Sequence, residues 1–411
     1  MRAIRSFTVP LVTLSLVGLV AAGCGSSGGG SDSGDKGSPI KIGASLPLTG
    51  DFSEPGKAAK QGYQVWQKTV NDKGGLLGRK VQMVVRDDAS DQNTVVADYN
   101  ALISRDKVNL LLGTFSSLLN IPASTVAERN RMLYVEPAGG APDIFNRGYK
   151  YLFFAQQATA DHQGDLFAQY ILSLPPDQRP KTAAYPTLDD PFAVPVLEGI
   201  RKKLEPAGIK TVYRKTYPGD TQNFDAIANA VKAANPELVV HGATFADGVG
   251  FIRALDKVGF DPKYFFETSA PSFADQFSKG IGVKNTEGIF YAVSWTPEAT
   301  TPGNKEFLDA YHKMFGNQVP AEDAADAYAT AQVMQAAVKA IGKIDDQRKL
   351  ADWLRSHTVD TILGPLKWSE TGAPQGQFLI GQWQSGQSEI VLPDAAKTAD
   401  QIVQRQGAAS G

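Results

Sequence analysis

A short hydroxyl-rich stretch after residue 112 is the part of this sequence best suited to holding an anion. The apolar run 110–112 (LLL) leads into 113–117 (GTFSS), and Asn120 is placed to cap a following helix with Pro122 in its first turn. In open α/β folds, ligands bind at the carboxyl ends of parallel strands, where a helix N-terminus favours an anionic group. The stretch is therefore predicted to hold the carboxylate of a small solute. The alternative is an ordinary strand-to-helix loop that uses Ser and Thr as caps.

The composition argues against several classes of protein. The chain has 411 residues, enough for two or three domains, and its formal net charge of -2 argues against a nucleic-acid-binding protein. Its one cysteine, Cys24, permits neither an intramolecular disulfide nor a cysteine-based metal site. The four histidines are widely scattered, so we predict no metal site and no cofactor.

The amino terminus is predicted to direct the protein out of the cytoplasm. Residues 1–23 combine a short basic start with an apolar run too short to span a membrane stably, as in a signal peptide. Small residues at 20–23 (VAAG) stand directly before Cys24 and resemble the lipobox of bacterial lipoproteins. Lipidation of Cys24 would supply the two acyl chains that stable anchoring needs. The alternative is a plain secretory signal with a chance cysteine.

The next segment has no residues able to build a core. Residues 25–38 (GSSGGGSDSGDKGS) are almost entirely glycine, serine and charged residues. With the lipidated Cys24, residues 24–38 are thus predicted to be a flexible tether, anchored to the cell membrane by lipid. The globular part begins near Pro39.

Strands and helices alternate through the globular part. Apolar runs at 40–46, 81–85, 110–112 and 132–135 predict four strands separated by amphipathic helices, and the pattern starts again with strands at 181–185, 209–213, 237–240 and 264–266. Beyond 295 the order changes to helices near 304–315, 321–341 and 347–356, and then to β-like runs. This pattern indicates an α/β protein with two doubly wound parallel-sheet lobes facing a cleft.

Four groups of short motifs, read together with the lipobox, resemble one family. They are 41–43 (KIG) and 47–50 (PLTG) with 71–75 (NDKGG) and 87–88 (DD); 113–117 (GTFSS) with 122–123 (PA); 137–140 (PAGG) with 147–149 (RGY); and 360–368 (DTILGPLKW) with Gly372. Their order and spacing resemble the periplasmic-binding type I solute-binding proteins of ABC importers, which include the leucine/isoleucine/valine-binding proteins.

The resemblance implies two lobes joined by three crossovers, here near 151–155, 292–295 and 377–380. Lobe 1 would be residues 39–155 plus 295–378, and lobe 2 would be residues 156–294 plus 379–411. Closure of the lobes would bury the solute and mark the loaded state for the transporter. The implied partners are a small solute and the permease and ATPase subunits of an ABC importer, and the protein is expected to be a monomer.

The resemblance also implies the ligand contacts of lobe 1. Ser117 matches the family's carboxylate-binding serine, with Ser116 beside it. Ala138, Gly139 and Gly140 match a second loop that holds the carboxylate and ammonium. Amino-acid binders place a threonine hydroxyl where this chain has Gly140, so one side-chain contact is missing.

In lobe 2 the expected contacts are apolar, and the acidic partner of a ligand ammonium is displaced. Phe192 and Phe245 would sandwich an apolar or planar solute, or alternatively each packs under its own loop. The family acid that pairs with the ammonium falls near Ser269, so Glu267, Glu136 or Asp190 would have to replace it.

The expected ligand follows from these contacts. A buried ammonium without an anion would cost several kcal/mol. Either Glu267, Glu136 or Asp190 therefore pairs with the ammonium, or the ligand has none. The resemblance favours a branched-chain or other apolar amino acid, and the alternative is an aromatic or short-chain carboxylate or an amide.

Two other classes of function are an enzyme and a sensor subunit. No G-x-S-x-G nucleophile elbow lies in the globular part, and the first strand leads into 48–52 (LTGDF) rather than a dinucleotide-binding G-x-G-x-x-G. The protein is thus predicted not to be an enzyme. A sensor subunit that signals to a membrane kinase or receptor would have the same fold and cleft, and this alternative stays open.

Overall fold

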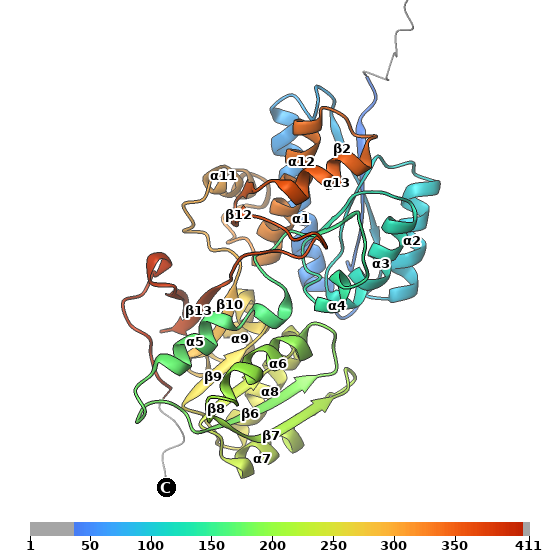
Figure 1. The fold of residues 1–411 in the computed structure, drawn as a ribbon. Helices are drawn as coiled ribbons and strands as arrows, with labels where there is room; N and C mark the ends of the chain where they lie inside the picture. Colours follow the sequence, from blue (N-terminus) through green and yellow to red (C-terminus); the bar gives the residue numbers. More distant parts are fainter. Residues whose placement is uncertain (1–36, 406–411) are drawn as a thin grey trace, which may run out of the picture. The chain divides into compact units, whose positions relative to one another are not determined.

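The structure is a computed structural model that describes residues 37–405. Two mainly parallel sheets organise this part of the chain (Figure 1). The predicted signal peptide, Cys24, most of the tether and residues 406–411 lie outside the described residues. Within residues 37–405, no helix is long and apolar enough to cross a membrane.

The first sheet is parallel throughout, with the strand order β2-β1-β3-β4-β5. Its strands are β1 (Ile40–Leu46), β2 (Val81–Asp87), β3 (Leu110–Leu112), β4 (Tyr134–Glu136) and β5 (Leu152–Phe154). Side chains alternate between its two faces: Leu110 and Leu112 belong to one buried core and Leu111 to another. The inner strand β3 (LLL) is buried on both faces and wholly apolar, as expected for a parallel sheet, whereas the edge strand β2 is only partly buried and carries polar residues.

Four helices connect these strands: α1 (Ser53–Asp72), α2 (Gln92–Ser104), α3 (Ser117–Arg129) and α4 (Pro142–Phe145). Helix α3 begins earlier than the sequence predicts. Its N-cap is Ser116, not Asn120, and Pro122 lies inside the helix. Asn120 is fully buried, and its side-chain amide donates to the carbonyl oxygens of Thr114 and Ser116, both at 3.0 Å. Asn120 therefore braces the loop before the helix rather than capping the helix.

The second sheet has the order β14-β13-β10-β9-β8-β6-β7, with β13 and β14 antiparallel at one side. Its strands are β6 (Thr182–Leu188), β7 (Lys210–Tyr217), β8 (Leu238–His241), β9 (Tyr264–Glu267), β10 (Ile289–Val293), β13 (Leu379–Gln384) and β14 (Gln387–Leu392). It too is covered on both faces, since Leu238 and Val240 pack in one core and Val239 in the other.

The helices of the second lobe are α5 (Asp165–Ser173), α6 (Ala193–Leu204), α7 (Asp225–Ala234), α8 (Phe245–Lys257), α9 (Ala274–Ile281) and α10 (Val283–Thr286). One prediction needs correction here. Residues 159–174 do not form a single helix, because a 3-10 turn (Ala160–His162) precedes α5. Gly164 separates the two; a side chain there would collide with Ile200 of α6, so the glycine permits close packing.

The late helices return to the first sheet. They are α11 (Asn304–Phe315), α12 (Glu322–Ile341) and α13 (Gln347–Ser356), followed by the hairpin β11 (Val359–Thr361) and β12 (Gly364–Leu366). Helix α12 packs along α1 (Figure 1). The Trp66 indole N–H of α1 donates to Gln335 Oε1 of α12 at 2.8 Å.

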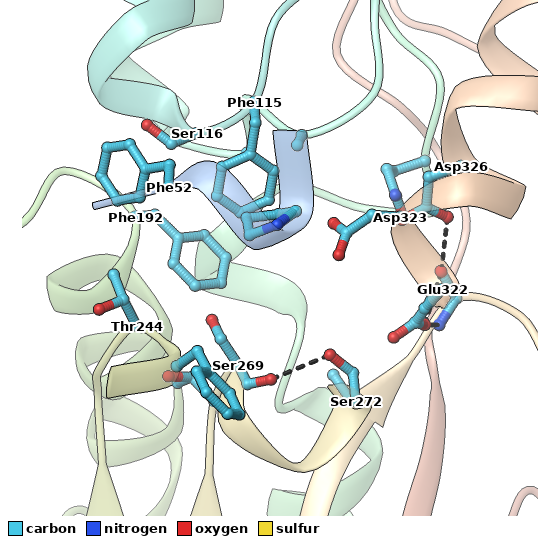
Figure 2. Close-up of a pocket in the computed structure, with 18 of the residues that line it drawn as sticks. Phe52, Phe115, Ser116, Phe192, Thr244, Ser269, Ser272, Glu322, Asp323 and Asp326 are labelled. Atoms are coloured by element: carbon cyan, nitrogen blue, oxygen red, sulfur yellow. Dashed lines mark hydrogen bonds between the residues drawn. The ribbon is translucent and has the colours of Figure 1, made fainter. Parts of the chain in front are cut away.

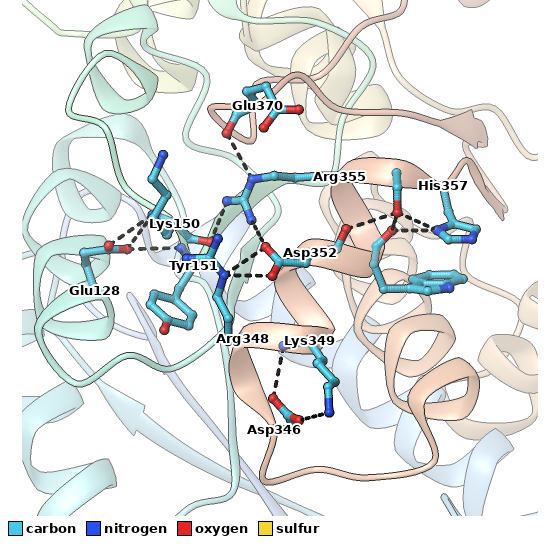
Figure 3. A network of polar contacts seen from close by, with 12 residues as sticks. Glu128, Lys150, Tyr151, Asp346, Arg348, Lys349, Asp352, Arg355, His357 and Glu370 are labelled. Carbon is cyan, nitrogen blue, oxygen red and sulfur yellow. Dashed lines mark hydrogen bonds and ion pairs between the residues drawn. The ribbon is translucent and has the colours of Figure 1, made fainter.

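A polar network also joins α13 to the first lobe (Figure 3). Glu128 at the end of α3 accepts the backbone N–H groups of Lys150 and Tyr151, just before β5. Arg355 of α13 donates to the carbonyl oxygens of Lys150 and Glu370. These contacts attach the late helices to the first lobe, although they are far from it in sequence.

The chain thus passes between the two lobes three times, after β5, after β10 and before β13. Such a passage by several segments permits a hinge motion. The predicted fold class, an α/β protein of two doubly wound lobes joined by three crossovers, is confirmed.

Candidate functional site

A cavity of about 130 Å³ lies between the two lobes. Its walls come from the carboxyl ends of strands in both sheets, the N-terminal ends of α1, α6 and α12, and all three crossovers. An apolar protein cavity of about 150 Å³ holds one benzene molecule, so this space suits a single small solute. Figure 2 shows its main side chains.

Ser116 supplies an unpaired hydroxyl to this cavity. The residue lies between β3 and α3 with φ of 69°, an uncommon conformation for a residue other than glycine. It is 8% exposed, and its Oγ has no hydrogen-bond partner among the described residues. The first-turn N–H groups of a helix also lack intrahelical acceptors and carry a partial positive charge. Ser116 and the start of α3 are thus suited to an anion.

Ser117, the favoured contact from the sequence, has a different environment. It is fully buried and does not line the cavity. Its Oγ accepts the backbone N–H of Ala141 at 3.0 Å, which ties the start of α3 to the loop after β4. The neighbouring hydroxyl of Thr114 is also engaged, because it donates to the buried carboxyl of Asp88 at 2.9 Å.

The loop 138–140 follows β4, which neighbours β3 in the sheet, and it lines the same cavity as Ser116. Ala138 and Gly140 line the cavity, whereas Gly139 lies behind them. The backbone N–H groups of Ala138 and Gly139 donate to Glu136 Oε2. Glu136 is fully buried, its Oε1 has no partner within the described part of the chain, and burial raises its pKa to about 8. Glu136 therefore holds the loop and does not line the cavity itself.

Phenylalanine side chains form most of the apolar wall. Phe192 and Phe245 both line the cavity, from the starts of α6 and α8. The sequence did not single out five others, Phe52, Phe115, Phe154, Phe273 and Phe378. The Phe52 and Phe115 rings are 5.7 Å apart, and those of Phe245 and Phe273 are 4.9 Å apart. Such a wall favours an apolar or planar body.

The residues considered for a ligand ammonium are separated by the fold. Ser269 lines the cavity, but Glu267 is fully buried outside it. Glu267 Oε2 lies 2.7 Å from Nδ1 of the buried His241, whose Nε2 lies 2.9 Å from the Tyr217 hydroxyl. Asp190 does line the cavity, and burial raises its pKa. Its Oδ1 accepts the N–H groups of Phe192 and Ala193 at the start of α6.

Three further carboxyls line the cavity at the start of α12: Glu322, Asp323 and Asp326. Ser294, at the second crossover, lies between two of them, with Oγ 2.6 Å from Glu322 Oε1 and 2.7 Å from Asp326 Oδ1. Acidic residues are common in the first turn of any helix, so this pattern did not mark a site in the sequence. The return of α12 to the first lobe places them in the cavity.

Two α/β lobes with a solute-sized cavity between them are typical of proteins that bind a small solute between two lobes. Residues 39–388 match the family model described as "Periplasmic binding protein". The chain belongs to this family. The predicted family and the solute-binding class of function are thereby confirmed.

Individual relatives agree with this assignment. The chain is 26% identical over 381 residues to Leu/Ile/Val-binding protein homolog 7 of Brucella suis, covering 88% of this chain and 93% of the relative. A leucine-binding protein from Thermotoga maritima has a TM-score of 0.77 at 21% identity, covering 86% of this chain and 97% of the other. An R. palustris solute-binding protein in complex with benzoate has a TM-score of 0.75 at 20% identity, covering 89% and 99%. At these identities the structural likeness shows the fold alone.

Proposed function

We propose that this protein captures a small carboxylate-bearing solute between its lobes and delivers it to an ABC permease. The observation that carries the proposal is the unpaired, buried hydroxyl of Ser116 beside the N-terminus of α3. A carboxylate accepts hydrogen bonds and is favoured at a helix N-terminus, so it matches both features. Ser116 thus takes the contact role that the family resemblance gave to Ser117. The loop 138–140 forms the adjoining wall.

The body of the solute would be apolar. Branched-chain amino acids are favoured by the relative described as a Leu/Ile/Val-binding protein homolog. The phenylalanine wall equally suits an aromatic carboxylate, and a similarly folded protein was solved in complex with benzoate. Amides lack the negative charge that the start of α3 favours, so they rank below both.

Transport follows from closure of the two lobes on the solute. We assign residues 39–155 plus 295–378 to lobe 1 and residues 156–294 plus 379–411 to lobe 2. The closed form would be recognised by permease and ATPase subunits, with the protein acting as a monomer and without catalysis. Periplasmic binding proteins work outside the cytoplasm, and this chain would do so from a lipid anchor on Cys24.

The anchor has a direct test. Cells expressing the parent chain should incorporate radiolabelled palmitate into the protein, and the Cys24→Ala variant should not. Absence of label from the parent would contradict the anchor while leaving the binding function untouched.

A thermal-shift screen tests the solute class. Leucine, isoleucine, phenylalanine, benzoate and a primary amide would be added separately, because a ligand that binds only the folded state raises the melting temperature. The proposal expects at least one carboxylate to give a concentration-dependent rise and the amide to give less. A larger rise with the amide than with every carboxylate would contradict it.

A further inference from the structure

The carboxyls at the start of α12 have few partners for their charge. Asp323 accepts no hydrogen bond from another described residue, and Figure 2 shows its carboxyl directed into the pocket. No lysine, arginine or histidine within residues 37–405 forms an ion pair with Glu322, Asp323 or Asp326. Burial raises the pKa of all three, and Glu322 raises that of Asp323 further, to about 7.

The contacts of Ser294 indicate that this group holds at least one proton. Its hydroxyl has one hydrogen but lies within hydrogen-bond distance of both Glu322 and Asp326. Glu322 Oε1 also accepts the backbone N–H groups of Ser294 and Trp295. The arrangement is satisfied when Glu322 is ionised and a protonated Asp326 donates to Ser294 Oγ. A cation beside these carboxyls would favour their ionised form over the protonated one.

A second observation points to a ligand with several N–H donors. Gln156 lines the cavity and is 5% exposed. Its amide nitrogen donates to the Pro137 carbonyl oxygen at 3.0 Å and lowers the pKa of Asp326, so the side chain lies against the acidic group. Its Oε1 has no partner among the described residues. A buried acceptor of this kind is costly to leave unpaired.

The chemistry of the group favours an organic cation over a metal ion. The described residues contain no group of three or more acidic, histidine or cysteine side chains arranged to hold a metal. An ammonium instead offers three N–H donors, which suits separate oxygens on Asp323, Asp326 and Gln156.

We propose that the start of α12 is a subsite for the cationic nitrogen of the solute, formed by Asp323, Asp326 and Gln156 with Glu322 and Ser294 behind them. The ligand is then an amino compound. Its positive charge is held by residues of lobe 1, and not by a residue at the lobe 2 position that Ser269 occupies. The assignment rests on the proposed function, in which Ser116 holds the carboxylate; Figure 2 shows Ser116 on the other side of the pocket from Asp323 and Asp326.

Matched ligands separate the two subsites. Isothermal titration at pH 7.5 would compare phenylalanine with 3-phenylpropanoate and leucine with 4-methylpentanoate, each pair differing only in the amino group, and would include phenethylamine, which lacks the carboxylate. The variants are Asp323→Asn and Asp326→Asn. The control, Asp360→Asn, removes an exposed carboxyl from β11, outside the cavity.

The proposal expects the amino member of at least one pair to bind about ten-fold more tightly than its partner, since hydrogen bonds to charged groups are strong. Asp323→Asn should remove most of that difference and leave the affinity for the desamino ligand within about threefold of the parent's, while Asp360→Asn changes neither.

Asp323 makes no hydrogen bond to another described residue, so this variant remains informative if Asp326→Asn fails to fold. Desamino ligands that bind as tightly as their partners, or an unchanged difference in Asp323→Asn, would overturn the cation subsite. Phenethylamine binding as tightly as phenylalanine would instead contradict the carboxylate site and support the cation subsite.

Discussion

Ser117 Oγ accepts the backbone N–H of Ala141 at 3.0 Å, and this bond ties the start of α3 to the loop that follows β4. Two adjacent serines therefore have different roles. Ser117 stabilises the wall of the cavity from behind, and the unpaired hydroxyl of Ser116 lines the cavity itself.

Removal of the Ser117 hydroxyl should reduce stability. Ser117→Ala leaves the buried N–H of Ala141 without its acceptor, which costs about 1–3 kcal/mol. We expect urea denaturation to give a correspondingly lower free energy of unfolding. Ser116→Ala is the matched control, because its Oγ has no bond to lose, and equal stability of the two variants would contradict the assigned roles.

The aromatic wall should contribute to affinity through Phe192. Phe192→Leu keeps most of the apolar volume but removes the flat ring, so affinity for an aromatic carboxylate should fall about threefold to ten-fold, as expected for a lost aromatic contact of about 0.5–1.5 kcal/mol. The control is Phe260→Leu, which alters a buried ring of the second lobe outside the cavity. Calorimetric titration of both variants checks this. A larger loss of affinity in the control would mean that the effect is structural.

The buried carboxyl of Glu136 should make stability depend on pH. Burial raises its pKa in the folded protein from an ordinary 4.5 to about 8. Its contribution is therefore fully present below about pH 4.5 and is lost as pH rises through about 8, because the unfolded chain ionises first. A tenfold difference in the acid dissociation constant between the folded and unfolded chain corresponds to about 1.4 kcal/mol in the free energy of unfolding.

Comparison of Glu136→Gln with the parent at pH 5 and pH 8 isolates this group. The amide stays neutral and keeps an oxygen for the N–H groups of Ala138 and Gly139, so the variant should lose less stability over this interval than the parent. Glu370→Gln, at an exposed position, should behave like the parent. Parallel curves for the parent and Glu136→Gln would contradict the raised pKa.

Affinity for an amino ligand should rise between pH 6 and pH 8. The α12 carboxyls have raised pKa values, with Asp323 at about 7, so at the lower pH they hold protons that a bound ligand cation would displace. Three other titratable groups are close to them. The buried Tyr291 lies near Glu322 and stays protonated in this range, because burial raises its pKa. Asp51 and Asp190 line the same cavity, and burial raises the pKa of Asp190. Titrations in buffers of different ionisation enthalpy should show proton release on binding. Proton uptake, or affinity independent of pH, would contradict the cation subsite.

Much of the fold could be predicted from sequence because the inner parallel strands, such as β3 and β8, are buried on both faces. Apolar runs such as 110–112 and 238–240 therefore stand out between amphipathic helices. The predicted start of α3 is wrong because Asn is a residue type that often caps helices. In the structure the Asn120 side chain hydrogen-bonds to the preceding loop and does not cap the helix. Local propensity cannot distinguish these two uses of one amide.

The site was only partly predictable, because the three crossovers bring together residues that are far apart in the sequence. Phe192, Phe245 and Ser116 follow strands, and a strand end is a recognisable position. Asp323 instead stands at the start of a helix more than 200 residues after Ser116, where an acidic residue ordinarily interacts only with the helix dipole. Its place in the cavity depends on how α12 returns to the first lobe, which no local pattern reports.

Calorimetric titration of the parent and Ser116→Ala with the carboxylate that binds best in the thermal-shift screen tests the central claim most directly. The parent should bind one solute per chain, and Ser116→Ala should bind it about ten-fold more weakly, with unchanged thermal stability, because a hydrogen bond to a charged group is lost. Equal affinity of the parent and Ser116→Ala would contradict the carboxylate site at the start of α3.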